Sequence, residues 1–163
     1  MEVKNTKIKN TKIKNFKIRN VGIDDMEDLA KLYFQFWNEE SDVEKMKAKF
    51  MRLQDNGAYI ILCAVEGNQV IGSVMGIVCD ELYGECKPFL VVENMIVDNQ
   101  HYKKGVGKML FAELEKQAIA KGCAQVILVT DEDRKGAQKF YESLGFPPNK
   151  NKGYKKKLIS VGN

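Results

Sequence analysis

Hydrophobic and polar positions follow two periods along the chain, one typical of strands and one typical of helices. Short apolar runs predict strands over 58–65, 70–79, 89–97 and 126–130, with shorter ones at 16–21 and 154–159. Apolar residues at helical spacing predict helices over 26–37, 105–121 and 133–143, and one more that runs from Ser41 toward Leu53. The expected order is β-α-α-β-β-β-α-β-α-β. Residues 89–130 form a strand–helix–strand unit, for which a right-handed parallel crossover is expected.

Short polar residues and glycines mark the expected helix ends. Asp24 precedes a helical run with Glu27 three residues on, and Ser41 stands in the same relation to Glu44, which is the spacing of a capping box. Gly122 follows the long helix in the manner of a C-cap. We therefore expect the first two helices to be capped by Asp24 and Ser41.

The first twenty residues contain an internal repeat. Three copies of one pentamer follow one another, at Thr6–Asn10, Thr11–Asn15 and Phe16–Asn20. A five-residue period fits neither a helix nor a strand, and three copies are too few for a solenoid. We interpret residues 1–15 as a low-complexity basic extension and residues 16–163 as one domain.

Length and composition are typical of a single globular domain. The chain has 163 residues, 44% of them hydrophobic and 29% charged, and no apolar run reaches the roughly 20 residues that span a bilayer. Its Lys- and Asn-rich start lacks the apolar segment of a secretory signal. We therefore expect a cytoplasmic protein with no membrane partner.

The formal net charge of +4 conceals a division along the chain. Residues 1–20 sum to +6, residues 21–148 to −7 and residues 149–163 to +5. The protein is thus expected to have an acidic body between two basic ends. A basic tail is usually a solvated arm, so we expect no specific nucleic-acid partner, and a nucleic-acid-binding arm stays as an alternative.

Cysteine and histidine spacing argues against a metal centre and against a disulfide framework. The four cysteines form no C-x-x-C pair, and His101 is the single histidine. Cys63 and Cys123 lie in or beside apolar runs and are expected to be small buried hydrophobic residues. A cysteine nucleophile would have to use His101 as its base, and this alternative stays open.

The segment from Val97 to Lys108 joins a buried strand to an amphipathic helix. Gly105 and Gly107 allow close approach of a ligand, and the free N–H groups of the first helical turn, with nearby lysines, would attract an anion such as a pyrophosphate. An ordinary strand–helix turn is the alternative. Met109 stands where a Walker A loop needs Ser or Thr, and Leu110 where a Rossmann fingerprint needs its third glycine.

A second motif lies one strand and one helix further on, where Ala137 to Phe146 reads A-Q-K-F-Y-E-S-L-G-F. Together the two segments resemble the GNAT superfamily of N-acetyltransferases, which carries [QR]-x-x-G-x-[GA] at the start of its central helix and A-x-x-F-Y-x-x-x-G-F at the end of the next one. The second pattern is complete here. The first has both glycines, but Tyr102 replaces the usual Gln or Arg.

The resemblance implies an α/β fold of the α+β type. It has a mixed, mostly antiparallel central sheet of 6–7 strands, about four flanking helices and a splayed parallel strand pair. It implies acetyl-CoA as cosubstrate and no metal. By carry-over, the pantetheine arm pairs with the backbone of Met95, Ile96 and Val97, and Asp133 contacts the cofactor. The carried-over pyrophosphate loop consists of Tyr102, Lys103, Lys104, Gly105, Val106, Gly107 and Lys108.

Acetyl transfer by direct attack of an amine on a thioester needs a base, an oxyanion donor and an acid for the thiolate. Tyr141 matches the tyrosine that the family commonly places beside the CoA sulfur, with a packing role as the alternative. Glu93 interrupts an apolar strand, where its parity places it with Val91, Met95 and Val97, and partial burial would raise a carboxyl pKa. The backbone N–H of Met95 or Ile96 is the expected oxyanion donor.

Glu81, Glu85 or an unaided water route are alternatives to Glu93 as base. The acceptor is expected to be the primary amine of a small, cationic molecule, because acidic residues crowd Asp24 to Glu44 near the expected acceptor wall and Tyr33, Phe36 and Trp37 could supply a stacking surface. A protein N-terminus or lysine, and a non-catalytic acyl-CoA-binding module, remain as alternative functions. The oligomeric state, a homodimer included, stays open.

Overall fold

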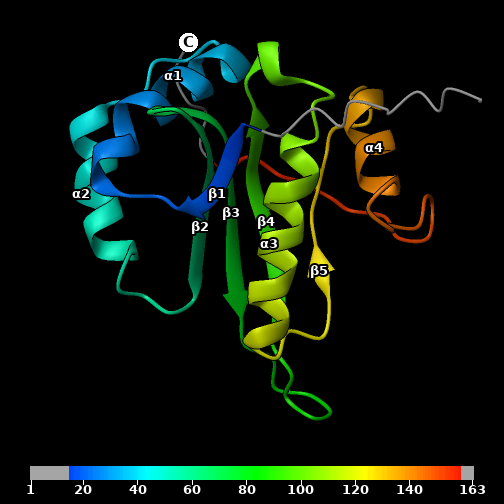
Figure 1. Ribbon diagram of the computed structural model, residues 1–163. Coiled ribbons are helices and arrows are strands. Elements are labelled where there is room, and N and C mark those ends of the chain that lie inside the picture. The colour runs from blue at the N-terminus through cyan, green and yellow to red at the C-terminus, as the bar shows by residue number, and fades with distance from the viewer. Residues whose placement is uncertain (1–14, 159–163) are drawn as a thin grey trace, which may run out of the picture.

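The computed structural model describes residues 15–158, which form one sheet with helices on both faces (Figure 1). The sheet has the order β1-β2-β3-β4-β5. Its strands are β1 (Phe16–Asn20), β2 (Tyr59–Glu66), β3 (Gln69–Cys79), β4 (Phe89–Val97) and β5 (Val126–Ile127). The first four strands pair antiparallel, and β4 pairs parallel with β5. The expected mixed sheet with one parallel pair is confirmed.

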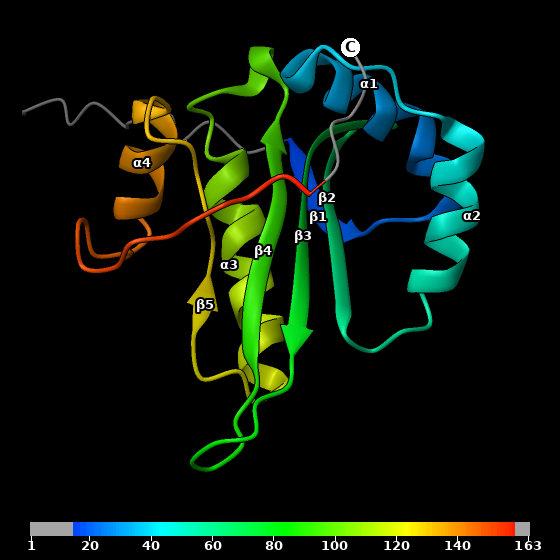
Figure 2. The ribbon, with the colours of Figure 1, turned by 180° about the vertical axis from the view of Figure 1, so that it is seen from behind.

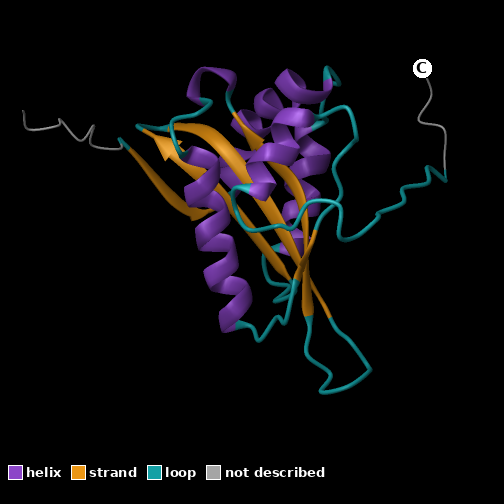
Figure 3. Ribbon diagram, turned by 90° about the vertical axis from the view of Figure 1, so that its right-hand side faces the viewer, coloured by secondary structure: helices purple, strands orange, loops and turns teal. Residues whose placement is uncertain are grey.

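The helices divide between the two faces of the sheet (Figure 3). They are α1 (Met26–Trp37), α2 (Val43–Leu53), α3 (Val106–Ala120) and α4 (Lys135–Glu142), with short 3-10 turns at Ile23–Asp25 and Asn99–His101. The long helix α3 packs on one face through Leu110, Phe111 and Leu114, which are fully buried. On the other face, α1 and α2 bury Leu29, Leu32 and Phe50 against β2 and β3.

Two expectations about strands are wrong. The sheet has five strands within the described residues, fewer than the 6–7 expected, because residues 154–158 form no ladder with any other strand. The strand expected over 126–130 pairs only at Val126 and Ile127. In both places the side-chain pattern suits a strand, but a strand needs a hydrogen-bonding neighbour, which local sequence does not specify.

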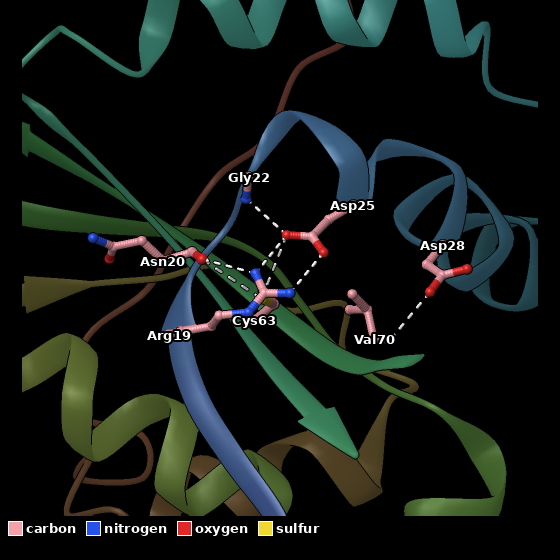
Figure 4. A network of polar contacts seen from close by, with 7 residues as sticks. All are labelled: Arg19, Asn20, Gly22, Asp25, Asp28, Cys63 and Val70. Carbon is pink, nitrogen blue, oxygen red and sulfur yellow. Dashed lines mark hydrogen bonds and ion pairs between the residues drawn. The ribbon is translucent and has the colours of Figure 1, made fainter. Parts of the chain in front are cut away.

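The start of the domain is fastened by an ion pair (Figure 4). Arg19 on β1 donates two hydrogen bonds to Asp25, at 2.6 and 2.8 Å, and a third at 3.2 Å to the Sγ of Cys63 on β2. Asp25 also accepts from the Gly22 N–H at 2.7 Å. These bonds hold the pKa of the Asp25 carboxyl below its usual range, and burial raises the pKa of the Cys63 thiol to about 11.

Both expected helix caps lie one residue away from their predicted positions. Asp25 occupies the N-cap of α1, where its carboxylate is engaged by Arg19 instead of the helix, and Asp24 is exposed. Asp42, not Ser41, caps α2 and accepts from the Lys45 N–H at 3.0 Å. Neighbouring residues of the same capping type are interchangeable in a sequence pattern, so the choice between them falls to tertiary contacts.

An irregularity in β4 changes which side chains face which helix. The pairing with β3 steps from Met75↔Glu93 to Ser73↔Ile96, so β4 contains one extra residue at this point. Asn94 adopts a φ of 51° there, as expected of a β-bulge. Beyond it Met95 packs toward α3, whereas Ile96 belongs to the core under α1 and α2.

The parallel strands β4 and β5 separate soon after they meet. Their register contains only Leu90↔Val126 and Val91↔Ile127, so the second half of β4 lacks a partner on this side among the described residues. The expected splayed pair is therefore confirmed. Behind the sheet, the segment that follows α4 crosses β4 on the face that carries α1 (Figure 2), and Gly153 packs beside Val129.

Candidate functional site

A cleft of about 110 Å³ opens where β4 and β5 part. One wall comes from the middle of β4 and another from the chain after β5, while the end of α1, the start of α4 and the C-terminal segment complete it. The lining residues are Phe36, Trp37, Val92, Glu93, Asn94, Met95, Leu128, Val129, Thr130, Asp131, Arg134, Tyr141 and Lys155. Five parts of the chain thus meet at a point where β4 has no hydrogen-bonded neighbour on this side among the described residues.

Glu93 reaches this cleft from β4, as the sequence indicates, but its surroundings differ from those expected. Its side chain is exposed, so the partial burial expected for it is wrong. The parity argument also fails in part, because the bulge at Asn94 turns Met95 and Val97 to the opposite face from Glu93. Glu93 therefore points into the open side of the cleft, where water reaches it.

Tyr141 reaches the same cleft from α4. Its ring packs edge to face against Phe140 and Phe146, at centroid distances of 5.3 and 5.9 Å, and stands beside the core under α3. Burial raises the pKa of the Tyr141 phenol; the positive charge of Arg134 opposes this effect and the negative charge of Glu93 adds to it. The phenol is therefore protonated at neutral pH and able to donate its proton.

The other carboxylates considered as bases lie elsewhere. Glu81 and Glu85 stand in the loop between β3 and β4, which extends from the end of the sheet away from the N-terminus of α3 (Figure 1). Neither lines the cleft, and Glu85 forms an ion pair with Lys87. Of the candidate bases named from the sequence, the structure brings only Glu93 close to Tyr141.

The glycine loop has the geometry of an anion site at the start of α3. Gly105 is the N-cap of the helix and adopts a φ of 88°, which favours glycine. Within the described residues no carbonyl accepts from the N–H groups of Val106, Gly107 or Lys108, and the first helical bond runs from the Met109 N–H to the Gly105 oxygen at 3.1 Å. These free donors fit the pyrophosphate of acetyl-CoA.

The remaining loop side chains face solvent. Tyr102, Lys103, Lys104 and Lys108 are all exposed. Lys103 adopts a φ of 60°, uncommon for a residue with a side chain. This arrangement fits a phosphate held mainly by main-chain N–H groups and attracted by flexible lysines, so Tyr102 in place of Gln or Arg leaves the main-chain donors intact.

Gly107 has a different role from the one that its motif suggests. A Cβ at this position would lie 3.1 Å from the Phe140 ring on α4 and 3.3 Å from the Met95 methyl group on β4. The missing side chain therefore allows α3 to pack against α4 and β4. Gly107 therefore sets the distance between the glycine loop and α4, the helix that carries Tyr141.

A polar network holds the chain between β4 and the glycine loop. Asp98 accepts from the Gln100 N–H at 2.9 Å and from Gln35 on α1 at 3.0 Å, and His101 lies 2.8 Å from it. Burial opposes ionisation of Asp98, yet these hydrogen bonds hold its pKa below the usual range. The other ring nitrogen of His101 lies 3.1 Å from Glu66, so among the described residues the side-chain partners of His101 are carboxylates, not cysteines.

The backbone after the bulge is the part of β4 best placed for a ligand. Asn94 and Met95 have no pairing residue on β3, and β5 has already separated at this level. Met95, Ile96 and Val97 were expected to pair with the pantetheine arm, and their edge toward β5 is free of strand partners within residues 15–158. Within this range Met95 has no assigned pairing residue on either neighbouring strand.

Sequence reasoning missed several residues that line the cleft. Asp133 is exposed in the turn before α4 and is not among the lining residues, whereas its neighbours Asp131 and Arg134 are. The Thr130 hydroxyl is buried and has no hydrogen-bond partner within the described chain. The turn itself carries no motif at these positions, so only the direction in which α4 starts reveals which side chains face inward.

The acidic residues between Asp24 and Glu44 do not line the cleft. Asp25 pairs with Arg19, and Asp28 accepts from Lys31 and from the Val70 N–H. Others cap or pair along α2: Asp42 with Lys45 and Glu44 with Lys47. The aromatic residues at the end of α1 do reach it, as Phe36 and Trp37 stack edge to face at 4.8 Å between their ring centroids.

Residues 15–158 contain neither a metal-ligand cluster nor a membrane-spanning helix. No three metal-binding side chains gather at one point of this range. Likewise, none of its helices combines the length and the apolar character that a membrane span requires.

Comparisons with known proteins agree on the family and on the fold. The model of the acetyltransferase (GNAT) family matches residues 23–146. No curated protein matches the chain.

Solved structures with the same fold share about a fifth of the sequence. Glucosamine-6-phosphate N-acetyltransferase from Arabidopsis thaliana has a TM-score of 0.79 and 23% identity, covering 88% of this chain and 99% of its own. A transcriptional regulator from Bacillus halodurans C-125 has a TM-score of 0.80 and 21% identity, covering 88% and 99%. An aminoglycoside N-acetyltransferase in complex with CoA has a TM-score of 0.73 and 20% identity, covering 88% and 95%.

Proposed function

Because the chain belongs to the acetyltransferase (GNAT) family, we propose that it transfers the acetyl group of acetyl-CoA directly to the primary amine of a small acceptor bound in the cleft between β4 and β5. The observation that carries this proposal is the meeting of Glu93 and Tyr141 in that cleft. They come from different elements, and each supplies one of the two proton transfers that amide formation from a thioester requires.

Acetyl-CoA fits the two features that flank this point. The free N–H groups at the start of α3 would hold its pyrophosphate, and the free edge of β4 from Met95 to Val97 would pair with its pantetheine arm. The Met95 N–H, next to the bulge, would stabilise the negative charge that develops on the thioester oxygen.

Glu93 and Tyr141 then have separate tasks. Glu93, directly or through a water molecule, takes a proton from the acceptor ammonium, so that the neutral nitrogen attacks the carbonyl carbon. As the carbon–nitrogen bond forms and the carbon–sulfur bond breaks, Tyr141 donates its proton to the leaving thiolate. The raised pKa of Tyr141 keeps that proton in place at neutral pH.

The size of the cleft favours a small acceptor over a protein segment. It measures about 110 Å³, and Trp37 and Lys155 are among its lining residues. The names of the similar structures do not decide the charge of the acceptor, because they include an amino-sugar phosphate and aminoglycosides. Whether the acceptor is cationic, as the sequence predicts, is therefore a question for a panel of amines.

A panel of primary amines, with detection of the CoA thiol released from acetyl-CoA, tests this function. We expect turnover of at least one small amine, and a loss of kcat of about a hundredfold or more in Tyr141→Phe and in Glu93→Gln. Tyr83→Phe and Glu85→Gln are matched controls in the loop between β3 and β4 and should keep full activity.

Unchanged kcat in either cleft variant would contradict the role assigned to that residue. Binding of acetyl-CoA without turnover of any amine in a broad panel would contradict the enzymatic proposal as a whole.

A further inference from the structure

The cleft contains charged side chains of both signs that form no ion pair within residues 15–158. Glu93 and Asp131 are negative, whereas Arg134 and Lys155 are positive. None of the ion pairs in the described part of the chain involves any of the four. By contrast, Asp25, which is largely buried, is satisfied by Arg19 and by the Gly22 N–H. Unpaired charges that face one small cleft are therefore available to a ligand.

Arg134 is the most constrained of the four. It occupies the N-cap of α4 and is only partly exposed, and its guanidinium carbon lies 4.3 Å from the centroid of the Phe36 ring, over its face. The turn that carries it is held by Gln138, whose side chain donates to the Glu132 carbonyl at 2.8 Å. The backbone N–H of Arg134 donates to the Asp131 carbonyl at 3.1 Å. The turn is thus held by hydrogen bonds, and the guanidinium itself contacts the Phe36 ring.

The contact with Phe36 leaves the Arg134 donors free. A cation over a ring face uses no N–H group in a conventional hydrogen bond, and none of the side-chain hydrogen bonds in the described part of the chain starts from the Arg134 guanidinium. A planar fork of donors matches a carboxylate or a phosphate, which it can bind through two parallel hydrogen bonds.

We propose that the acceptor carries an anionic group, a carboxylate or a phosphate, which Arg134 binds while Glu93 faces the amine. The inference rests on the proposed function, because it names the class of acceptor for the same cleft. Lys155, from the C-terminal segment, adds a second positive charge to the lining of the cleft, and Asp131 adds a second negative one.

This assignment replaces the cationic acceptor indicated by the sequence. That expectation relied on the acidic residues between Asp24 and Glu44. None of them lines the cleft, and four of them form ion pairs elsewhere, namely Asp25, Asp28, Asp42 and Glu44. The residues that do line the cleft carry two charges of each sign. They therefore suit a molecule with an ammonium and an anionic group better than a molecule with several ammonium groups.

A charge series on one carbon skeleton tests the proposal. Butylamine, 4-aminobutanoate, 4-aminobutyl phosphate and 1,4-diaminobutane present the same amine with a neutral, a carboxylate, a phosphate or a second ammonium group. The same comparison is repeated with aromatic and amino-sugar skeletons, and initial rates of CoA release are measured. We expect the anionic members to have the highest kcat/KM within each skeleton that reacts.

Arg134→Gln is expected to lower kcat/KM for the anionic amines by about tenfold to a hundredfold more than for the neutral amine of the same skeleton. Arg134→Lys should retain part of the effect, because the charge remains but the fork is lost. Lys135→Gln, one residue further on and exposed, is the control and should behave like the wild type.

The outcomes distinguish failure of the anionic acceptor from failure of acetyl transfer. Preference for butylamine or 1,4-diaminobutane, or equal loss on all amines in Arg134→Gln together with a lower melting temperature, overturns the anionic acceptor and leaves acetyl transfer standing. A lack of turnover with every amine, although acetyl-CoA binds, overturns the proposed function and this inference with it.

Discussion

Arg19 distinguishes the third pentamer of the N-terminal repeat from the other two. The first two copies carry Lys9 and Lys14 at this position, and a lysine offers no fork for two parallel bonds. In the third copy the guanidinium bonds both oxygens of Asp25 and reaches the Sγ of Cys63. Only the third copy can therefore fasten β1 to the turn before α1 and to β2.

We expect Arg19→Lys to lower the free energy of unfolding by about 1–2 kcal/mol, since a two-bond pair that is partly screened by solvent becomes a single flexible contact. Urea denaturation followed by circular dichroism measures this difference. Lys17→Arg, on the exposed side of the same strand, is the control. Equal stability of Arg19→Lys and the wild type would show that the pair contributes nothing.

Asp25 also makes the stability depend on pH. Its hydrogen bonds with Arg19 depress its pKa in the folded state, so the contribution is present above the ordinary carboxyl pKa of about 4 and is lost as the pH falls through the lower folded value. The stability difference between wild type and Asp25→Asn should be constant from neutral pH to about pH 5 and should shrink below pH 4. A difference that grows on acidification would reverse the assigned sign.

Among the elements, β4 illustrates how one residue changes a whole strand. Asn94 takes the extra position of the bulge with a φ of 51°, a conformation that asparagine and glycine tolerate and β-branched residues do not. The bulge directs Glu93 and Met95 to opposite faces and leaves the backbone between them without a partner on β3.

We therefore expect Asn94→Val to lower the stability by about 1–2 kcal/mol and to reduce kcat, whereas Asn94→Gly keeps kcat near the wild-type value. Thermal unfolding and CoA release measure the two effects. If valine is tolerated as well as glycine, the positive φ is not needed at this position.

The packing of α3 against α4 sets the position of the glycine loop relative to Tyr141, the proposed acid. A methyl group at Gly107 would press on Phe140, so we expect Gly107→Ala to cost about 1 kcal/mol of stability and to weaken acetyl-CoA binding. Gly136→Ala on α4, with nothing within 4 Å of the new methyl group, should be neutral or slightly stabilising. Calorimetric titration with acetyl-CoA compares both variants with the wild type.

At the scale of the molecule, residues 15–158 form two cores, one on each face of the sheet, and the cleft lies between elements drawn from both halves of the chain. The basic extension predicted over 1–15 lies almost wholly outside the described residues.

We expect a chain that starts at Asn15 to keep its melting temperature and its affinity for acetyl-CoA, because the described cores and cleft use none of the deleted residues. Retention on DNA at increasing salt, measured for both lengths, tests the alternative of a nucleic-acid-binding arm. A retention that disappears only in the shortened chain would support that arm.

The sequence by itself determined the order of the elements up to α4, the bounds of β4 at 89–97, the glycine loop at the start of α3 and the family, because these depend on local periodicity and on short motifs. Tertiary structure alone decided the rest. Local sequence specifies neither the partner of a strand nor a bulge, so the missing last strand and the face of Met95 were predicted wrongly. Arg134 joins the cleft only because α4 begins beside α1, a contact between residues about a hundred positions apart in the chain.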